Sequence, residues 1–196
     1  MEDKQPKNDG SIINEGIINE SPLIKLPPLS VLQTSKSICK IETPFQVSSG
    51  FFLKFFKGEE DFFCLMTNEH IITKELIEQK QKINIYYDNE SKVKEIPLNP
   101  EERFIKEFNT DINIDATVVQ IIPKDDIEKN YFLLPCIEYM NTFNELINKE
   151  ITIIQYPLGG QLCYSNGIIK EISEYEFVHK VSTQSGSSGS PVFFKR

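Results

Sequence analysis

The sequence has no tryptophan, only two histidines and only four cysteines in 196 residues. The cysteines stand at positions 39, 64, 136 and 163, so none forms the closely spaced pairs of a zinc site. We therefore expect no metal and no cofactor, and we interpret all four cysteines as buried free thiols. Because histidine is scarce, chemistry that needs an imidazole base must use His70 or His179.

The sequence also lacks any apolar stretch close to the roughly 20 residues that a transmembrane helix needs. Its first residues, Met1 to Asp9, are polar and contain no signal-peptide core. The formal charge of −8 and the pI near 4.9 disfavour nucleic acid or an anionic membrane as the main partner. We expect a soluble, intracellular protein with one or two small cores, and the sequence leaves its oligomeric state open.

The most informative segment is Gly186-Ser187-Ser188-Gly189-Ser190-Pro191, which precedes an apolar run at Val192–Phe194. Small neighbours let a serine hydroxyl stand clear of the backbone, and they let adjacent N–H groups converge on a developing oxyanion. A Ser/Gly cluster is also typical of a linker or turn. The segment by itself leaves both interpretations open.

A histidine and an aspartate occur in matching contexts. His70 follows an apolar run at Phe62–Met66, which predicts a strand that ends close to the imidazole. Asp115 comes directly before a run rich in β-branched residues. A carboxylate on one imidazole nitrogen fixes the tautomer that leaves the other nitrogen free to accept a serine proton. Each residue alone has a structural interpretation, but the order His70, Asp115, Ser188 predicts a catalytic triad.

The motifs around these residues resemble those of trypsin-like (chymotrypsin-fold) serine peptidases, and among them the V8-like glutamyl endopeptidase and HtrA-like branches. The segments that carry the resemblance are Ser48–Phe52, Thr67–Ile72, Asp115–Val119, Tyr156–Gly159 and Ser182–Phe193. The resemblance implies a serine endopeptidase that acts on protein or peptide substrates through an acyl-enzyme intermediate.

Carried over position by position, the resemblance implies that Ser188 is the nucleophile, His70 the general base and Asp115 the orienting carboxylate. The N–H groups of Gly186 and Ser188 would form the oxyanion hole.

The resemblance also assigns Ser182 and Thr183 to substrate binding. Ser182 stands where trypsins carry an aspartate, so a preference for arginine or lysine is disfavoured. Ser187 replaces the aspartate or asparagine of many relatives, and Ile71 replaces the cysteine that follows the histidine in secreted trypsins. For His179, which precedes the serine motif, we expect a surface or pairing role and no catalytic one.

The implied fold is all-β, with two antiparallel six-stranded Greek-key barrels. The predicted divisions are an N-terminal tail, disordered or a pro-segment (1–36), a first barrel with His70 and Asp115 (37–124), a connection (125–149) and a second barrel with Ser188 (150–196). Six apolar runs predict the strands of the first barrel, and five further runs, among them Gln161–Tyr164 and Gly167–Ile172, predict strands after residue 150. The second barrel is expected to be incomplete, because the sequence stops soon after Ser188.

Two other functions stay open at this level. The chain could be an inactive pseudoprotease that binds a peptide or protein in the peptidase cleft. It could also be an interaction protein whose acidic domain displays the N-terminal tail. For the stop at Arg196 we favour a fragment of a longer protein over a processing product or a degraded relative.

Overall fold

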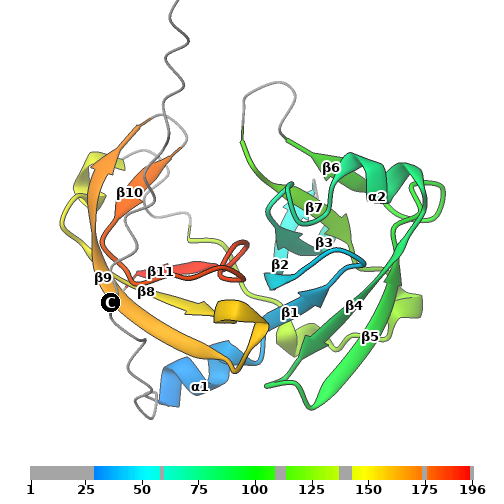
Figure 1. The fold of residues 1–196 in the computed structure, drawn as a ribbon, viewed down its shortest axis with the longest axis horizontal. Helices are drawn as coiled ribbons and strands as arrows, with labels where there is room; N and C mark the ends of the chain where they lie inside the picture. The colour runs from blue at the N-terminus through cyan, green and yellow to red at the C-terminus, as the bar shows by residue number, and fades with distance from the viewer. Residues whose placement is uncertain (1–28, 58–59, 109–113, 137–142, 174–175, 195–196) are drawn as a thin grey trace, which may run out of the picture.

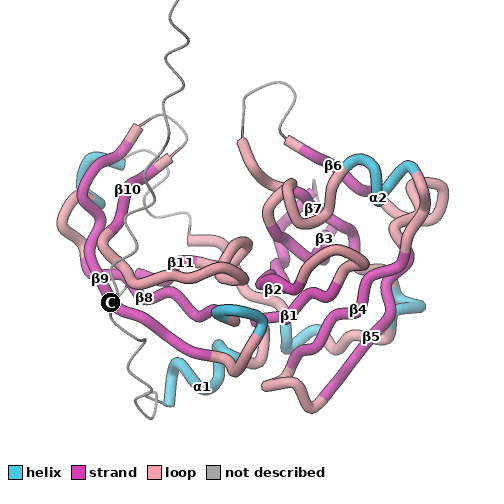
Figure 2. The backbone as a smooth tube through the Cα atoms, in the orientation of Figure 1, coloured by secondary structure: helices cyan, strands magenta, loops and turns pink. Residues whose placement is uncertain are grey.

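The computed structural model describes residues 29–57, 60–108, 114–136, 143–173 and 176–194. Strands dominate this part of the chain, and helices are few and short (Figures 1 and 2). The strands form two antiparallel sheets, each strongly curled, with the first sheet on the right of Figure 1 and the second on the left. The predicted all-β, trypsin-like class is confirmed.

The first sheet contains seven strands in the order β5-β4-β1-β2-β3-β7-β6. Their bounds are β1 (Ile38–Glu42), β2 (Val47–Lys57), β3 (Glu60–Thr67), β4 (Lys82–Tyr87), β5 (Lys92–Pro97), β6 (Ile105–Glu107) and β7 (Thr117–Gln120). The prediction of six strands is wrong here, because β6 has only three residues and one of them is apolar. Pairing with β7, and not its own sequence pattern, makes this segment a strand.

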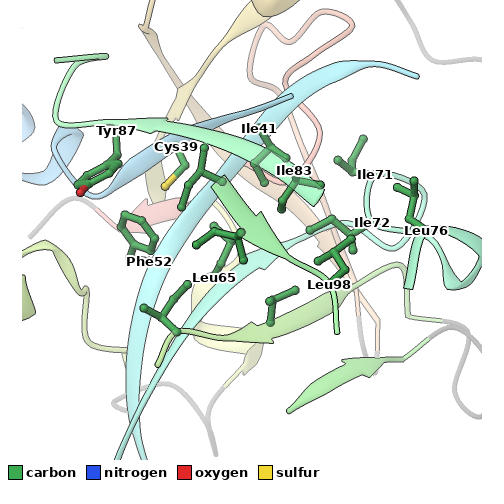
Figure 3. Packing of buried hydrophobic residues seen from close by; sticks show 14 of the residues in the cluster. Cys39, Ile41, Phe52, Leu65, Ile71, Ile72, Leu76, Ile83, Tyr87 and Leu98 are labelled. Carbon is green, nitrogen blue, oxygen red and sulfur yellow. The ribbon is translucent and has the colours of Figure 1, made fainter. Parts of the chain in front are cut away.

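One face of the first sheet buries the larger core (Figure 3). Strand β4 alternates in burial, with Ile83, Ile85 and Tyr87 inside, as expected for a strand with one buried face. Helix α2 (Lys74–Glu78) covers part of this core with Leu76 and Ile77. Its N-cap is Thr73, whose hydroxyl accepts a hydrogen bond from the N–H of Leu76.

The second sheet has four strands among the described residues, in the order β10-β9-β8-β11. They are β8 (Glu150–Gln155), β9 (Cys163–Ile172), β10 (Phe177–His179) and β11 (Val192–Phe194). Two runs that were predicted as separate strands form the single strand β9. Glycine is needed at position 167, in the middle of β9, because a Cβ there would stand only 1.9 Å from the carbonyl oxygen of Lys180. The glycine therefore allows a close approach of two backbones and does not mark a turn.

The segments outside the sheets differ in part from the predictions. Helix α1 (Leu29–Ser35) occupies the end of the predicted tail, while residues 1–28 lie outside the described residues. The connection contains 3-10 helices, namely η1 (Pro123–Asp125), η2 (Lys129–Tyr131) and η3 (Phe143–Leu146). A fourth, η4 (Pro157–Gly159), follows β8. No helix in the described ranges is long and apolar enough to cross a bilayer.

All four cysteines are free, as predicted. Cys39 and Cys64 are buried, and burial raises the pKa of the Cys64 thiol to about 12. The prediction of burial is wrong for Cys136, which is exposed, and only partly correct for Cys163.

Candidate active site

His70 and Asp115 form a direct pair in the first sheet. The Nδ1 atom of His70 lies 2.6 Å from Oδ2 of Asp115, and the backbone N–H of His70 donates to Oδ1 of the same carboxylate at 3.1 Å. The two side chains are 48% and 47% exposed. The bond at Nδ1 leaves Nε2 as the nitrogen that is not bonded to the carboxylate, which is the arrangement a general base requires.

The chain around His70 is fixed on both sides. Strand β3 ends at Thr67, whose hydroxyl donates to the carbonyl of Ser49 at 2.8 Å. On the other side, Ile71 and Ile72 are buried in the core of the first sheet, where Figure 3 shows both side chains. The imidazole is therefore mounted on a short turn between two anchored segments.

Asn68 also holds Asp115 in place. Its amide nitrogen donates to the Asp115 carbonyl oxygen at 2.8 Å and to Oδ2 at 3.0 Å. In the sequence, Asn68 stood out only as part of the Thr67–Ile72 motif, with no role of its own. The feature of the sequence that could have identified Asn68 is its position two residues before His70. In the structure this position brings its side chain within hydrogen-bond distance of Asp115.

Ser188 lies on the loop between β10 and β11, which is red in Figure 1 and runs between the two sheets. This serine loop (residues 180–191) is seated on β2 of the first sheet. The carbonyl oxygen of Ser188 accepts hydrogen bonds from the Ser49 N–H at 3.0 Å and from the Ser48 hydroxyl at 2.9 Å. Strand β2 of the first sheet therefore positions Ser188 of the second sheet. The same strand also binds Thr67, which lies three residues before His70.

Ser49 connects three parts of the site. Its hydroxyl donates to the carbonyl oxygen of Gly186 at 2.8 Å and accepts a hydrogen bond from the N–H of Tyr156 at 2.9 Å. Ser49 is fully buried, so these bonds compete with no solvent. This role could not be predicted from the sequence, because the partners of Ser49 are more than 100 residues away.

Two glycines in the serine loop have backbone conformations that other residues rarely adopt. Gly186 has φ +86° and Gly189 has φ +82°. A Cβ on Gly189 would lie 2.2 Å from the Ser49 carbonyl oxygen and 2.3 Å from the Thr67 hydroxyl. Glycine is therefore needed both for the turn and for the close contact with the first sheet.

The two amides that were predicted to form an oxyanion hole are available. Neither the N–H of Gly186 nor that of Ser188 donates a hydrogen bond to any residue in the described ranges. Ser187 stabilises the turn between them, because its hydroxyl accepts from the Gln184 N–H at 3.1 Å and its own N–H donates to the Gln184 carbonyl at 3.0 Å. The serine at this position thus keeps a local hydrogen-bonding role.

The candidate nucleophile and the candidate base are not in hydrogen-bond contact. Within the described part of the chain, no hydrogen bond joins the imidazole of His70 to the hydroxyl of Ser188. Catalytic hydrogen bonds are often long in ligand-free proteins and shorten when substrate binds. Asn68, which holds Asp115, lies on the wall of the same cavity as Ser188.

That cavity has a volume of about 880 Å³ and lies beside the serine loop. Thr183, which the resemblance assigned to substrate binding, lines this cavity. Ser182 is not among the lining residues, and its carbonyl oxygen instead accepts a hydrogen bond from the buried side-chain amide of Gln155 at 3.0 Å. Thr183 and Ser182 thus have different surroundings, and the assignment of both residues to substrate binding stays a prediction.

His179 also lines the cavity, at the end of β10. Its Nδ1 atom is buried without a hydrogen-bond partner among the described residues, and burial lowers the pKa of the imidazole. His70 and not His179 pairs with an aspartate, so the choice of His70 as candidate base agrees with the geometry. Among the described residues, no group of three or more histidine, cysteine or acidic side chains is arranged to hold a metal ion.

Two antiparallel sheets, one carrying an imidazole–carboxylate pair and the other a serine loop, place the protein in the class of trypsin-like serine peptidases. The family described as trypsin-like peptidase domain matches residues 48–196, and the chain belongs to this family. The match does not select between the V8-like and HtrA-like branches. No curated protein matches the chain.

Solved structures share the fold at low sequence identity. The inactive mutant form of Rv3671c from M. tuberculosis H37Rv is 15% identical, with a TM-score of 0.53, over 88% of this chain and 78% of that one. The serine endoprotease from Yersinia pestis is also 15% identical, with a TM-score of 0.55. That comparison covers 87% of this chain but only 55% of the Yersinia protein.

Proposed function

We propose that the protein is a serine endopeptidase that cleaves protein or peptide substrates through an acyl-enzyme. Ser188 attacks the scissile carbonyl, while His70 takes the hydroxyl proton and returns it to the leaving amine. Asp115 keeps the imidazole in the required tautomer. The N–H groups of Gly186 and Ser188 bind the oxyanion, and Thr183 contacts the substrate side chain in the cavity.

The observation that carries this proposal is the 2.6 Å contact between His70 and Asp115. It is supported by the seating of the serine loop on β2, which places Ser188 near the turn that carries His70. The unused amides of Gly186 and Ser188 support it further, since free N–H groups can bind an oxyanion without losing another bond.

The experiment is covalent labelling with a fluorophosphonate probe, followed by mass spectrometry of the modified peptide. We expect labelling at Ser188, its loss in Ser188→Ala, and a large decrease in His70→Ala. Ser185→Ala is the matched control, because Ser185 lies in the same loop and lines the same cavity. Absence of labelling in the folded wild-type protein, or equal labelling of Ser188→Ala, would refute the mechanism.

A second candidate function is peptide binding without cleavage, in which the protein acts as a pseudoprotease. The observation that favours it is the open contact between His70 and Ser188 beside a cavity of about 880 Å³. Peptide binding that persists in His70→Ala, together with no turnover in the wild-type protein, would support this function over hydrolysis.

A further inference from the structure

An exposed apolar cluster lies beside the candidate catalytic residues. It consists of Phe45, Val47 and Leu158, and we call these three residues the apolar rim. Phe45 lies in the turn before β2, Val47 begins β2, and Leu158 lies in η4. Phe45 and Leu158 are 71% and 73% exposed, and Val47 is 37% exposed.

The apolar rim reaches both halves of the site. The side-chain amide of Gln46, between Phe45 and Val47, donates to the carbonyl oxygen of His70 at 2.7 Å. On the other side, the N–H of Leu158 donates to the carbonyl of Ser185 in the serine loop, and Leu158 lines the cavity with Ser188.

The two parts of the apolar rim also touch each other. A Cβ on Gly159, the neighbour of Leu158, would lie 2.8 Å from Cγ1 of Val47, so η4 packs directly on the start of β2. Val47 at the start of β2 and η4 are therefore in contact, and the rim lies between His70 and the serine loop.

The backbone of Leu158 has an unusual conformation for an exposed leucine. Its φ of 55° and ψ of 20° lie in the left-handed region, which glycine and asparagine adopt far more readily. Exposure to water provides no burial energy that would offset this strain. Strained residues of this kind cluster at ligand-binding positions, where the ligand covers the side chain.

We infer that the apolar rim binds the residues that follow the scissile bond, so that peptides with apolar residues directly after the cleaved bond are preferred. This inference rests on the proposed function. His70 must protonate the leaving amine, so the leaving peptide begins next to His70, where the rim lies. The part of the cavity that Thr183 lines then holds the acyl part of the substrate.

The preference for apolar residues after the scissile bond can be measured in the reverse of the step in which the amine leaves. In this reverse step, an added amine attacks the acyl-enzyme. p-Nitrophenyl acetate acetylates Ser188 and releases p-nitrophenolate, which reports on the proposed function alone. An added dipeptide amide then competes with water for the acetyl group. Its amine nitrogen bonds to the acetyl carbon, the ester bond to Ser188 Oγ breaks, and the amine proton passes through His70 to Oγ.

Leucyl-leucinamide and seryl-serinamide are the two probes, and the measured quantity is the ratio of acetylated dipeptide to acetate. We expect the ratio to be about tenfold higher for leucyl-leucinamide, because covering apolar side chains favours its binding. Leu158→Asn and Phe45→Ser should each reduce this advantage about threefold or more. Asparagine tolerates the left-handed backbone, so Leu158→Asn should fold normally.

Phe56→Ser is the matched control, because Phe56 is 68% exposed near the far end of β2 and should leave the advantage unchanged. Absence of p-nitrophenolate release above Ser188→Ala would refute the proposed function and the inference with it. Release with equal capture of the two dipeptide amides would refute the inference alone. So would an advantage that Leu158→Asn and Phe45→Ser both leave unchanged.

Discussion

Replacement of Gly189 by alanine tests whether the serine loop must be seated on the first sheet. At φ +82°, a residue with a Cβ is strained by about 1–2 kcal/mol. The added Cβ would lie 2.2 Å from the Ser49 carbonyl oxygen and 2.3 Å from the Thr67 hydroxyl, whereas real Cβ contacts almost never fall below 3.0 Å. The loop must therefore move away from β2 by about 1 Å.

Such a movement affects both stability and reactivity. The two hydrogen bonds to the Ser188 carbonyl, from Ser49 and Ser48, would weaken at about 1 kcal/mol each. Together with the backbone strain, we expect the free energy of unfolding of Gly189→Ala to fall by about 2–4 kcal/mol. A displacement of about 1 Å at the reacting group should slow fluorophosphonate labelling about 100-fold.

Urea denaturation followed by circular dichroism measures the first effect, and a labelling time course measures the second. Gly160→Ala is the control, because Gly160 has φ −79° and the nearest atom to its added Cβ is the Pro157 carbonyl oxygen at 3.2 Å. If Gly189→Ala matched the wild-type protein in both assays, the seating of the loop would not be required, and the argument from these contacts would fail.

Three further predictions concern stability and its pH dependence. Asp125→Asn leaves the buried guanidinium of Arg103 without its carboxylate and should lower the free energy of unfolding by about 3 kcal/mol, whereas the exposed Glu95→Gln should cost less than about 1 kcal/mol. Equal losses in urea denaturation would contradict the importance of the buried pair. Thr73→Ala removes the N-cap of α2 and should cost about 1 kcal/mol in the same assay, and an unchanged midpoint would refute the capping argument. Burial lowers the pKa of His179 below its ordinary value of 6.5, so the unfolded chain takes up this proton first as the pH falls. The stability that the neutral imidazole contributes is thus present above pH 6.5 and is lost as the pH falls below it, and His179→Gln should flatten the dependence of unfolding free energy on pH below 6.5. If the unfolding free energy of His179→Gln depended on pH as steeply as that of the wild-type protein, His179 would not titrate as inferred.

The candidate pair His70–Asp115 could be predicted because its signals are local. Each residue stands beside an apolar run, and a strand places its terminal residues at a sheet edge. The buried Ile71 and Ile72 that follow the histidine were visible in the sequence as apolar residues. Strand β6 could not be predicted, because its three residues gain their structure from pairing with β7.

The surroundings of Ser182 could not be predicted from its place in the motif. Its place in the motif indicated the pocket, and its neighbour Thr183 does line the cavity. The structure instead uses the Ser182 carbonyl as the acceptor for the buried amide of Gln155. Which member of a neighbouring pair faces a cavity depends on the twist of the loop, which a motif does not encode.

The sequence by itself determined the strand-rich class, the scarcity of possible bases and the residues of the candidate triad. These follow from composition, apolar periodicity and short motifs, all of which act over a few residues. Only the tertiary structure decided that Ser48 and Ser49 hold the serine loop, that Gly189 must lack a Cβ, and that Leu158 lies exposed beside the site. These properties depend on contacts such as that between Ser48 and Ser188, which are 140 residues apart in the chain. Contacts of that range exist only after both sheets have formed and packed, so no local pattern can specify them.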